Sequence, residues 1–143
     1  MASMDITATL DVSCPTDRIR PWICDLDRYP EWLSIVPTAT AEANDPSAWS
    51  VELRAKVGPI ARSKKLRMIR TVDEPDHVRF ERSENDGRSH SPWVLDASLT
   101  PIDAGSRLTM QLHYGGTFGA GLFQRLLEDE IENSKESLRA LVE

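Results

Sequence analysis

The feature that most constrains the fold of this chain is a series of apolar rows with a period of two residues. The first row consists of Ile6, Ala8, Leu10 and Val12. Polar residues separate its members, which is typical of a strand with one buried face. Similar rows follow at residues 49–55, 66–72, 78–81, 93–99 and 108–114. Turn-forming residues separate the rows, so the sequence predicts an antiparallel sheet of about six to seven strands.

Two short helices are predicted between the first row and the second. Thr16 or Asp17 is the expected N-cap of the first helix. Pro21 is expected to bend that helix, because proline lacks a backbone donor. The second helical segment covers residues 29–35 and ends before Pro37.

One long helix is predicted at the end of the chain, from about residue 118 to residue 142, which corresponds to roughly seven turns. Its apolar face consists of Phe123, Leu127, Ile131, Leu138 and Leu141. A face of this width must pack against a broad apolar surface, and the sheet provides one. The predicted fold is therefore α+β, with a curved sheet wrapped around the last helix in a single domain over residues 1–143.

Turn signals connect the predicted strands. Glu74-Pro75-Asp76 predicts a turn before the row at 78–81, and Asn85-Asp86-Gly87 is a hairpin signal after it. The sequence therefore favours short connections between successive strands.

Length and charge argue against several classes of protein. The chain has 143 residues and a net charge of −6, which disfavours nucleic-acid binding because that binding depends on neutralising phosphates. No signal peptide and no apolar stretch of the roughly 20 residues that span a bilayer are present. We therefore expect a cytoplasmic protein without a membrane span, in which Cys14 and Cys24 are structural thiols. The sequence does not specify an oligomeric state.

A basic stretch at residues 54–70 contains seven Lys and Arg residues and no acid. We interpret it as solvated strand faces. An anion-attracting patch is the alternative.

Motifs that carry chemistry are few. The chain lacks a Gly-x-Ser-x-Gly elbow, a phosphate loop and a His-Glu-x-x-His pair. His77, His90 and His113 are scattered, with no cysteine or carboxylate at metal-ligand spacing. The sequence therefore predicts neither a metal site nor a cofactor, and it identifies no catalytic residue.

Residues 14–32 contain a recognisable pattern. A first strand leads into a helix that ends in Asp, and a Tyr-Pro-x-Trp step follows; these positions are held by Asp25, Tyr29, Pro30 and Trp32. This segment resembles the opening of the START-like superfamily, also called SRPBCC, and the chain is most similar to its polyketide cyclase/dehydrase and lipid-transport group. The resemblance implies a helix-grip fold with a cavity, but it implies no particular reaction. Pro21 departs from the usual apolar pattern of the first helix.

A mostly apolar gap between the sheet and the last helix is the expected ligand site. The candidate wall residues are Leu66, Met68, Phe80, Trp93, Leu95, Met110, Leu112 and Tyr114. The candidate residues of the last helix are Phe123, Leu127, Glu130, Ile131 and Ser134. Each of the apolar residues is equally compatible with ordinary core packing.

Glu130 and Ser134 are polar residues within the apolar stripe of the last helix. A carboxylate on a buried face needs a partner, so Glu130 is expected to hydrogen-bond a ligand or to pair with Arg70 or Arg82. In the alternative interpretation, Glu130 lies at the wet edge of the stripe and both arginines emerge at strand ends.

Three functions fit the sequence. The first is binding of an apolar small molecule, such as a lipid, isoprenoid or aromatic polyketide, with Glu130, Ser134 and Tyr114 orienting its polar end. The second is a polyketide cyclase or dehydratase that uses the same cavity and depends mainly on positioning of the substrate. The third is a protein-interaction module that uses the basic strand face.

Overall fold

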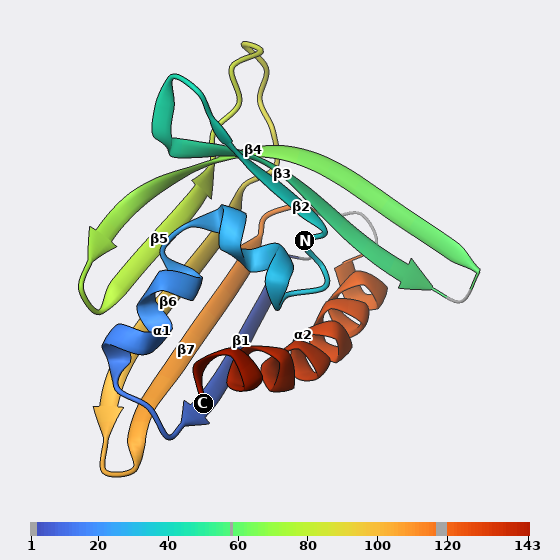
Figure 1. Ribbon diagram of the computed structural model, residues 1–143. Coiled ribbons are helices and arrows are strands. Elements are labelled where there is room, and N and C mark those ends of the chain that lie inside the picture. The colour runs from blue at the N-terminus through green and yellow to red at the C-terminus, as the bar shows by residue number, and fades with distance from the viewer. Residues whose placement is uncertain (1–2, 58, 117–119) are drawn as a thin grey trace.

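An antiparallel sheet extends through most of the described chain, which in this computed structural model comprises residues 3–57, 59–116 and 120–143. Side chains at 55–57, 60, 62 and 120–123 lie outside this description. Within the described residues the sheet has seven strands, in the order β1-β7-β6-β5-β4-β3-β2. The strands are β1 (Met4–Val12), β2 (Thr38–Glu42), β3 (Asp45–Val57), β4 (Ile60–Glu74), β5 (His77–Arg82), β6 (Trp93–Ile102) and β7 (Gly105–Tyr114). Figure 1 shows that the sheet is strongly curved.

Helices cover the concave face of this sheet. Helix α1 (Thr16–Ile23) and the short 3-10 helix η1 (Leu26–Glu31) follow β1, and α2 (Ala120–Val142) ends the chain. Figure 1 shows α2 beside β1, with α1 and η1 across the same face. Helix α2 contacts β1 and β3, and η1 contacts β2 and β3. The architecture is the predicted α+β helix-grip fold, with a curved sheet around a long C-terminal helix.

The apolar rows of the sequence occupy the concave face. In β1, Ile6, Leu10 and Val12 are buried, whereas the polar residues between them are exposed. The register then matches like rows across the sheet, for example Ile6 opposite Leu112 in β7. Because side chains alternate between the faces of a strand, the period-two pattern places an apolar surface under α2.

The start of the helical region differs from the sequence prediction. Helix α1 begins at Thr16 with Pro15 as its N-cap, and no side chain caps it. The backbone N–H of Arg18 donates to the Pro15 carbonyl at 3.1 Å, which closes the first turn without a side chain. The second helix is a 3-10 helix over Leu26–Glu31 rather than residues 29–35.

Backbone hydrogen bonds explain that shift. The N–H of Arg28 donates to the Asp25 carbonyl, so the turn begins at Asp25. The N–H groups of Trp32 and Leu33 both donate to the Tyr29 carbonyl, which ends the helix.

The hairpin signal at residues 85–87 is confirmed, because residues 83–92 connect the antiparallel neighbours β5 and β6. The connection is longer than a tight turn, and the Arg82 guanidinium holds it by donating to Glu84 at 2.7 Å and to the Ser91 carbonyl at 3.2 Å.

One expectation for the last helix was wrong. Leu141 is 40% exposed, whereas Val142 is 1% exposed. Val142 follows Leu138 by four residues, so it continues the buried stripe at helical spacing.

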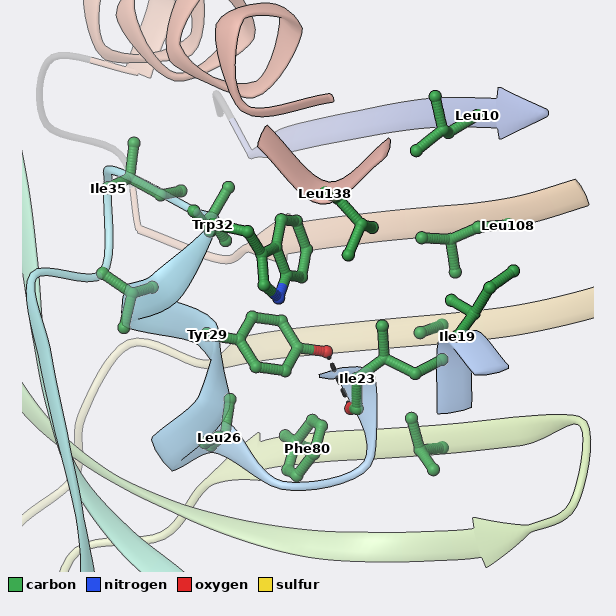
Figure 2. Packing of buried hydrophobic residues seen from close by; sticks show 14 of the residues in the cluster. Leu10, Ile19, Ile23, Leu26, Tyr29, Trp32, Ile35, Phe80, Leu108 and Leu138 are labelled. Carbon is green, nitrogen blue, oxygen red and sulfur yellow. Dashed lines mark hydrogen bonds between the residues drawn. The ribbon is translucent and has the colours of Figure 1, made fainter. Parts of the chain in front are cut away.

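A packed aromatic cluster fixes η1 against the sheet. Phe80 of β5 contacts Tyr29 and Trp49 edge-on, with ring centroids 6.1 and 5.6 Å apart. The Tyr29 hydroxyl donates to the Ile23 carbonyl at 2.9 Å (Figure 2), and the Trp32 indole N–H donates to the Trp22 carbonyl at 3.0 Å. Burial raises the pKa of the Tyr29 hydroxyl well above its ordinary value, so this donor stays protonated. These contacts place the segment after η1 opposite α2.

Candidate ligand-binding site

A cavity of about 80 Å³ lies between the concave face of the sheet, the segment after η1, and α2. Strands β1, β3, β4, β6 and β7 all contribute to its wall. Its lining residues are Ile6, Ala8, Thr9, Leu10, Leu26, Trp32, Leu33, Ile35, Val36, Val51, Leu53, Leu66, Met68, Trp93, Leu95, Leu108, Met110, Leu112, Ile131, Lys135 and Leu138. An enclosed space built from both sheet and helix is the usual form of a small-molecule site.

The cavity surface is almost entirely apolar. Among the described lining residues, Thr9 carries a hydroxyl, Trp32 and Trp93 carry indole N–H groups, and Lys135 carries a charge. The Trp32 N–H already donates to Trp22. Such a wall binds by burying apolar surface, and the described part of it presents no carboxylate or histidine to a bound molecule.

Incomplete filling by aliphatic side chains leaves this space open. Leu53, Leu95, Met110, Leu112 and Ile131 are only partly buried although they pack against the core. Large aromatic side chains fill the interior around Phe80, whereas most of the side chains that line the cavity are aliphatic, with Trp32 and Trp93 as the aromatic members. Because protein interiors are normally close-packed, partly buried side chains of this kind mark a place where another molecule fits.

Seven of the residues singled out from the sequence line this cavity together. They are Leu66, Met68, Trp93, Leu95, Met110, Leu112 and Ile131. Six come from strand rows whose parity is visible in the sequence, and Ile131 comes from the helical stripe.

The other apolar candidates lie elsewhere. Phe80 is fully buried in the aromatic cluster, and Leu127 is buried at 1% exposure without lining the cavity. Tyr114 stacks on Trp93 at 4.5 Å between centroids. Its ring also lies over Gly116, where a Cβ would meet the hydroxyl at 1.9 Å, so a larger residue at this position would displace the Tyr114 side chain. The side chain of Phe123 lies outside the described residues.

Glu130 and Ser134 join α2 to the segment after η1. The Ser34 backbone N–H donates to the Ser134 hydroxyl at 3.2 Å, and the Ser34 hydroxyl donates to the Glu130 carboxylate at 2.5 Å. Neither residue of α2 lines the cavity. The polar side chains of Glu130 and Ser134 therefore have a hydrogen-bond partner within the protein, which is Ser34.

The two arginines considered as partners of Glu130 pair with other groups. Arg70 contacts the Asp25 carboxylate at 2.8 Å, and Arg82 contacts Glu84 at 2.7 Å. A bulge between Arg70 and Val72 shifts the register of β4, so the parity of the row ends there. The Arg70–Asp25 pair links β4 to the start of η1, which gives Asp25 a structural role.

Several lining residues escaped the sequence analysis. They are Ile6, Ala8, Thr9, Leu10, Leu26, Trp32, Leu33, Ile35, Val36, Val51, Leu53, Leu108, Lys135 and Leu138. The rows that contain Ile6, Val51 and Leu108 were visible, but periodicity does not tell which rows lie under the last helix. Residues 33–36 have no periodic signal, because they belong to an irregular segment.

Other titratable groups are paired at the surface. His77 contacts Asp96, His90 contacts Asp86 at 2.8 Å, and His113 contacts Asp5 at 2.7 Å. In the described part of the chain, no three His, Cys, Asp or Glu residues group as a metal site would require. Cys14 and Cys24 are free thiols, and burial raises the pKa of both. No helix among the described residues is long and apolar enough to cross a membrane.

The curved sheet, the long helix within its curve and the apolar space between them make up a helix-grip fold. The model of the family described as polyketide cyclase / dehydrase and lipid transport matches residues 3–143. The chain therefore belongs to this family.

Solved structures with the same fold share little sequence with the chain. A START superfamily protein from Mycobacterium smegmatis has a TM-score of 0.71 and 14% identity, with 96% of each chain covered. A protein from Thermus thermophilus has a TM-score of 0.70 and 17% identity, over 99% of this chain and 97% of that one. The di-domain ARO/CYC BexL from the BE-7585A biosynthetic pathway has a TM-score of 0.71 and 12% identity, over 99% of this chain and 50% of its own. No curated protein sequence matches the chain at a significant level.

Proposed function

We propose that this protein binds an apolar small molecule in the cavity between the sheet and α2. The observation that carries the proposal is the partly enclosed, almost wholly apolar space whose walls come from five strands, the segment after η1 and α2. Burial of apolar ligand surface supplies roughly 25 cal/mol per Å² before the costs of association. A lipid, isoprenoid or aromatic polyketide provides such a surface. We also propose a cytoplasmic location, in keeping with the free thiols at Cys14 and Cys24.

The size of the cavity limits the ligand. A volume of about 80 Å³ is below the roughly 300–1,000 Å³ of sites for drug-sized molecules. The last few carbons of a hydrocarbon chain fit this space, whereas a longer chain or a ring requires partly buried side chains such as Met110 and Leu112 to move. A polycyclic ligand requires α2 to move away from the segment after η1, which the link between Ser34 and α2 opposes.

Turnover is the competing function. The family description includes cyclases and dehydrases, and one similar fold belongs to an ARO/CYC protein. A cyclase needs a group that moves protons, and among the described lining residues only Thr9 and Lys135 offer a hydroxyl or an amine for this. This scarcity favours binding without a reaction.

The basic residues of the stretch 54–70 fall into two groups in the structure: some form ion pairs and others are exposed. Arg67 and Arg70 form ion pairs with Glu42 and Asp25. Arg54, Lys64 and Lys65 are exposed. Exposed charges of this kind carry little binding energy at physiological salt, so an interaction module is a weaker proposal than a ligand site.

Native mass spectrometry tests the proposed function. The protein is purified from its own source, its mass is measured, and any small molecule is extracted under denaturing conditions and identified. A bound apolar compound at one per chain supports the proposal, and incubation with that compound reveals whether a product forms. A matched Ala8→Phe variant should lose the compound, because the larger side chain occupies the cavity. A clean apo mass, with no binding of fatty acids, quinones or aromatic polyketides, would contradict it.

A further inference from the structure

The apolar cavity meets a polar groove between β1 and α2. Thr9, Leu10 and Lys135 line both spaces. The groove continues outward along the exposed side of β1 and α2, where its other residues are all charged: Asp11, Arg107, Glu132, Glu136 and Arg139. Helix α2 contacts β1 directly along this seam. At the edge of the sheet next to α2, the cavity therefore borders a polar groove.

Lys135 is the charged side chain among the described residues that line the cavity. Lysine can keep its hydrocarbon stem on an apolar surface while its ammonium group remains in water. The Lys135 ammonium contacts the Glu132 carboxylate at 2.8 Å, and Glu132 lines only the groove. The ammonium group thus stands at the boundary between the two spaces, with its stem beside the cavity.

The other cations of the groove are held by stronger contacts. Arg107 binds both carboxylate oxygens of Asp11, at 2.7 and 3.0 Å. Arg139 contacts Glu136 and also donates to the Asp11 carbonyl at 3.4 Å. Among the described residues, Lys135 has the single contact to Glu132; the Lys135 side chain is 22% exposed and that of Glu132 is 67% exposed. A pair three residues apart on a helix whose carboxylate is this exposed contributes little, so the Lys135 ammonium can exchange this partner for another anion.

We propose that the ligand has one anionic end, which the Lys135 ammonium group binds at this boundary while the apolar part of the ligand occupies the cavity. This inference rests on the proposed function and narrows its ligand class to apolar molecules with a carboxylate or another single anionic group. The hydroxyl of Thr9, a residue that also lines both spaces, is the second polar group at the boundary. A neutral ligand would leave the charge of Lys135 without a role in binding.

Binding of matched acid and ester ligands tests the inference. Decanoic acid and methyl decanoate have the same apolar chain and differ in charge at neutral pH. Affinities are measured by displacement of a fluorescent apolar probe for the unmodified protein, for Lys135→Met and for Lys65→Met. The methionine keeps most of the apolar stem, and Lys65, exposed on β4, is the control for loss of one positive charge.

The unmodified protein should bind the acid more tightly than the ester. Lys135→Met should weaken acid binding about tenfold and leave ester binding unchanged, because one charge-assisted contact is lost. Lys65→Met should behave as the unmodified protein. Glu132→Gln should tighten acid binding about threefold, since it removes the anion that competes for Lys135.

Two results would overturn the inference. Equal binding of acid and ester by the unmodified protein would show that charge is not recognised. An unchanged preference for the acid in Lys135→Met would place the anion elsewhere. In both cases the apolar ligands still bind, so the proposed function survives. Failure of every apolar ligand to bind would contradict the proposed function and the inference with it.

Discussion

Two halves of the interior under the same sheet are filled in different ways. Around η1, Tyr29, Trp49 and Phe80 are fully buried, and Phe80 contacts both of the other rings edge-on. Under α2, residues such as Met110 and Leu112 are partly buried around a cavity of about 80 Å³. Both regions are apolar. The size and shape of the side chains, rather than their hydrophobicity, therefore decide whether a region under this sheet becomes a packed core or a binding site.

The largest expected effect separates the two halves by stability. Phe80→Ala should lower the free energy of unfolding by about 3–5 kcal/mol, because it removes a ring from a closely packed cluster. Met110→Ala should cost less than about 2 kcal/mol, because this side chain already borders empty space. Urea unfolding of both variants measures the difference. Equal losses would mean that the two regions are packed alike.

A buried hydrogen bond provides the next largest effect. Tyr29→Phe removes the donor to the Ile23 carbonyl and should cost about 1–3 kcal/mol, since a buried acceptor loses its partner. Tyr114→Phe is the control, because Tyr114 is only half-buried. Thermal or urea unfolding compares the two. Similar small losses would show that the Tyr29 hydroxyl does not fix η1.

Filling the cavity should affect binding more than stability. Ala8→Phe places a ring in the space under α2, and it should weaken binding of an apolar ligand at least tenfold, or about 1.4 kcal/mol. Its free energy of unfolding should stay the same or rise, because no packed neighbour is displaced. Ala140→Phe, at an exposed position of α2, is the matched control. A strong loss of stability in Ala8→Phe would mean that the region is already full.

The smallest expected effect concerns the link between α2 and the segment after η1. Ser34→Ala removes the hydroxyl contact to Glu130 and should cost about 0.5–1.5 kcal/mol. Ser50→Ala, exposed on β3, should leave stability nearly unchanged. Urea unfolding measures both. No difference between the two variants would indicate that Glu130 is a solvated residue at the edge of the stripe.

The fold could be predicted from the sequence because the periods of strands and helices are local properties of the chain. The row at Ile6 identifies the buried face of a strand, and the stripe through Leu127 identifies the buried face of the last helix. Because these two faces must pack against each other, they predict a sheet layer and a helix layer. The errors fell where local rules compete with tertiary contacts. The second helix begins earlier than predicted because its hydrogen bonds start at Asp25, and the connection marked by the hairpin signal at Asn85 is longer than a tight turn because contacts of Arg82 hold it.

The cavity was harder to predict from the sequence, because its extent depends on the space that the side chains leave unfilled. Periodicity identified the parity of Met68 and Leu112, which line the cavity, but Phe80 has the same character and fills the packed half. Residues 33–36 carry no periodic pattern. Glu130 stood out correctly as a polar residue in an apolar stripe, but its partner, Ser34, is 96 residues away in the sequence.

The position of a bound hydrocarbon ligand would show whether the space under α2 is a binding site. A crystal structure of the protein with ω-bromodecanoic acid would mark the apolar end of the ligand by the anomalous scattering of bromine. We expect bromine inside the cavity, among Met68, Leu112 and Ile131, which all line it. Bromine only at the surface of the molecule, with the space under α2 empty or closed by the side chains, would contradict it.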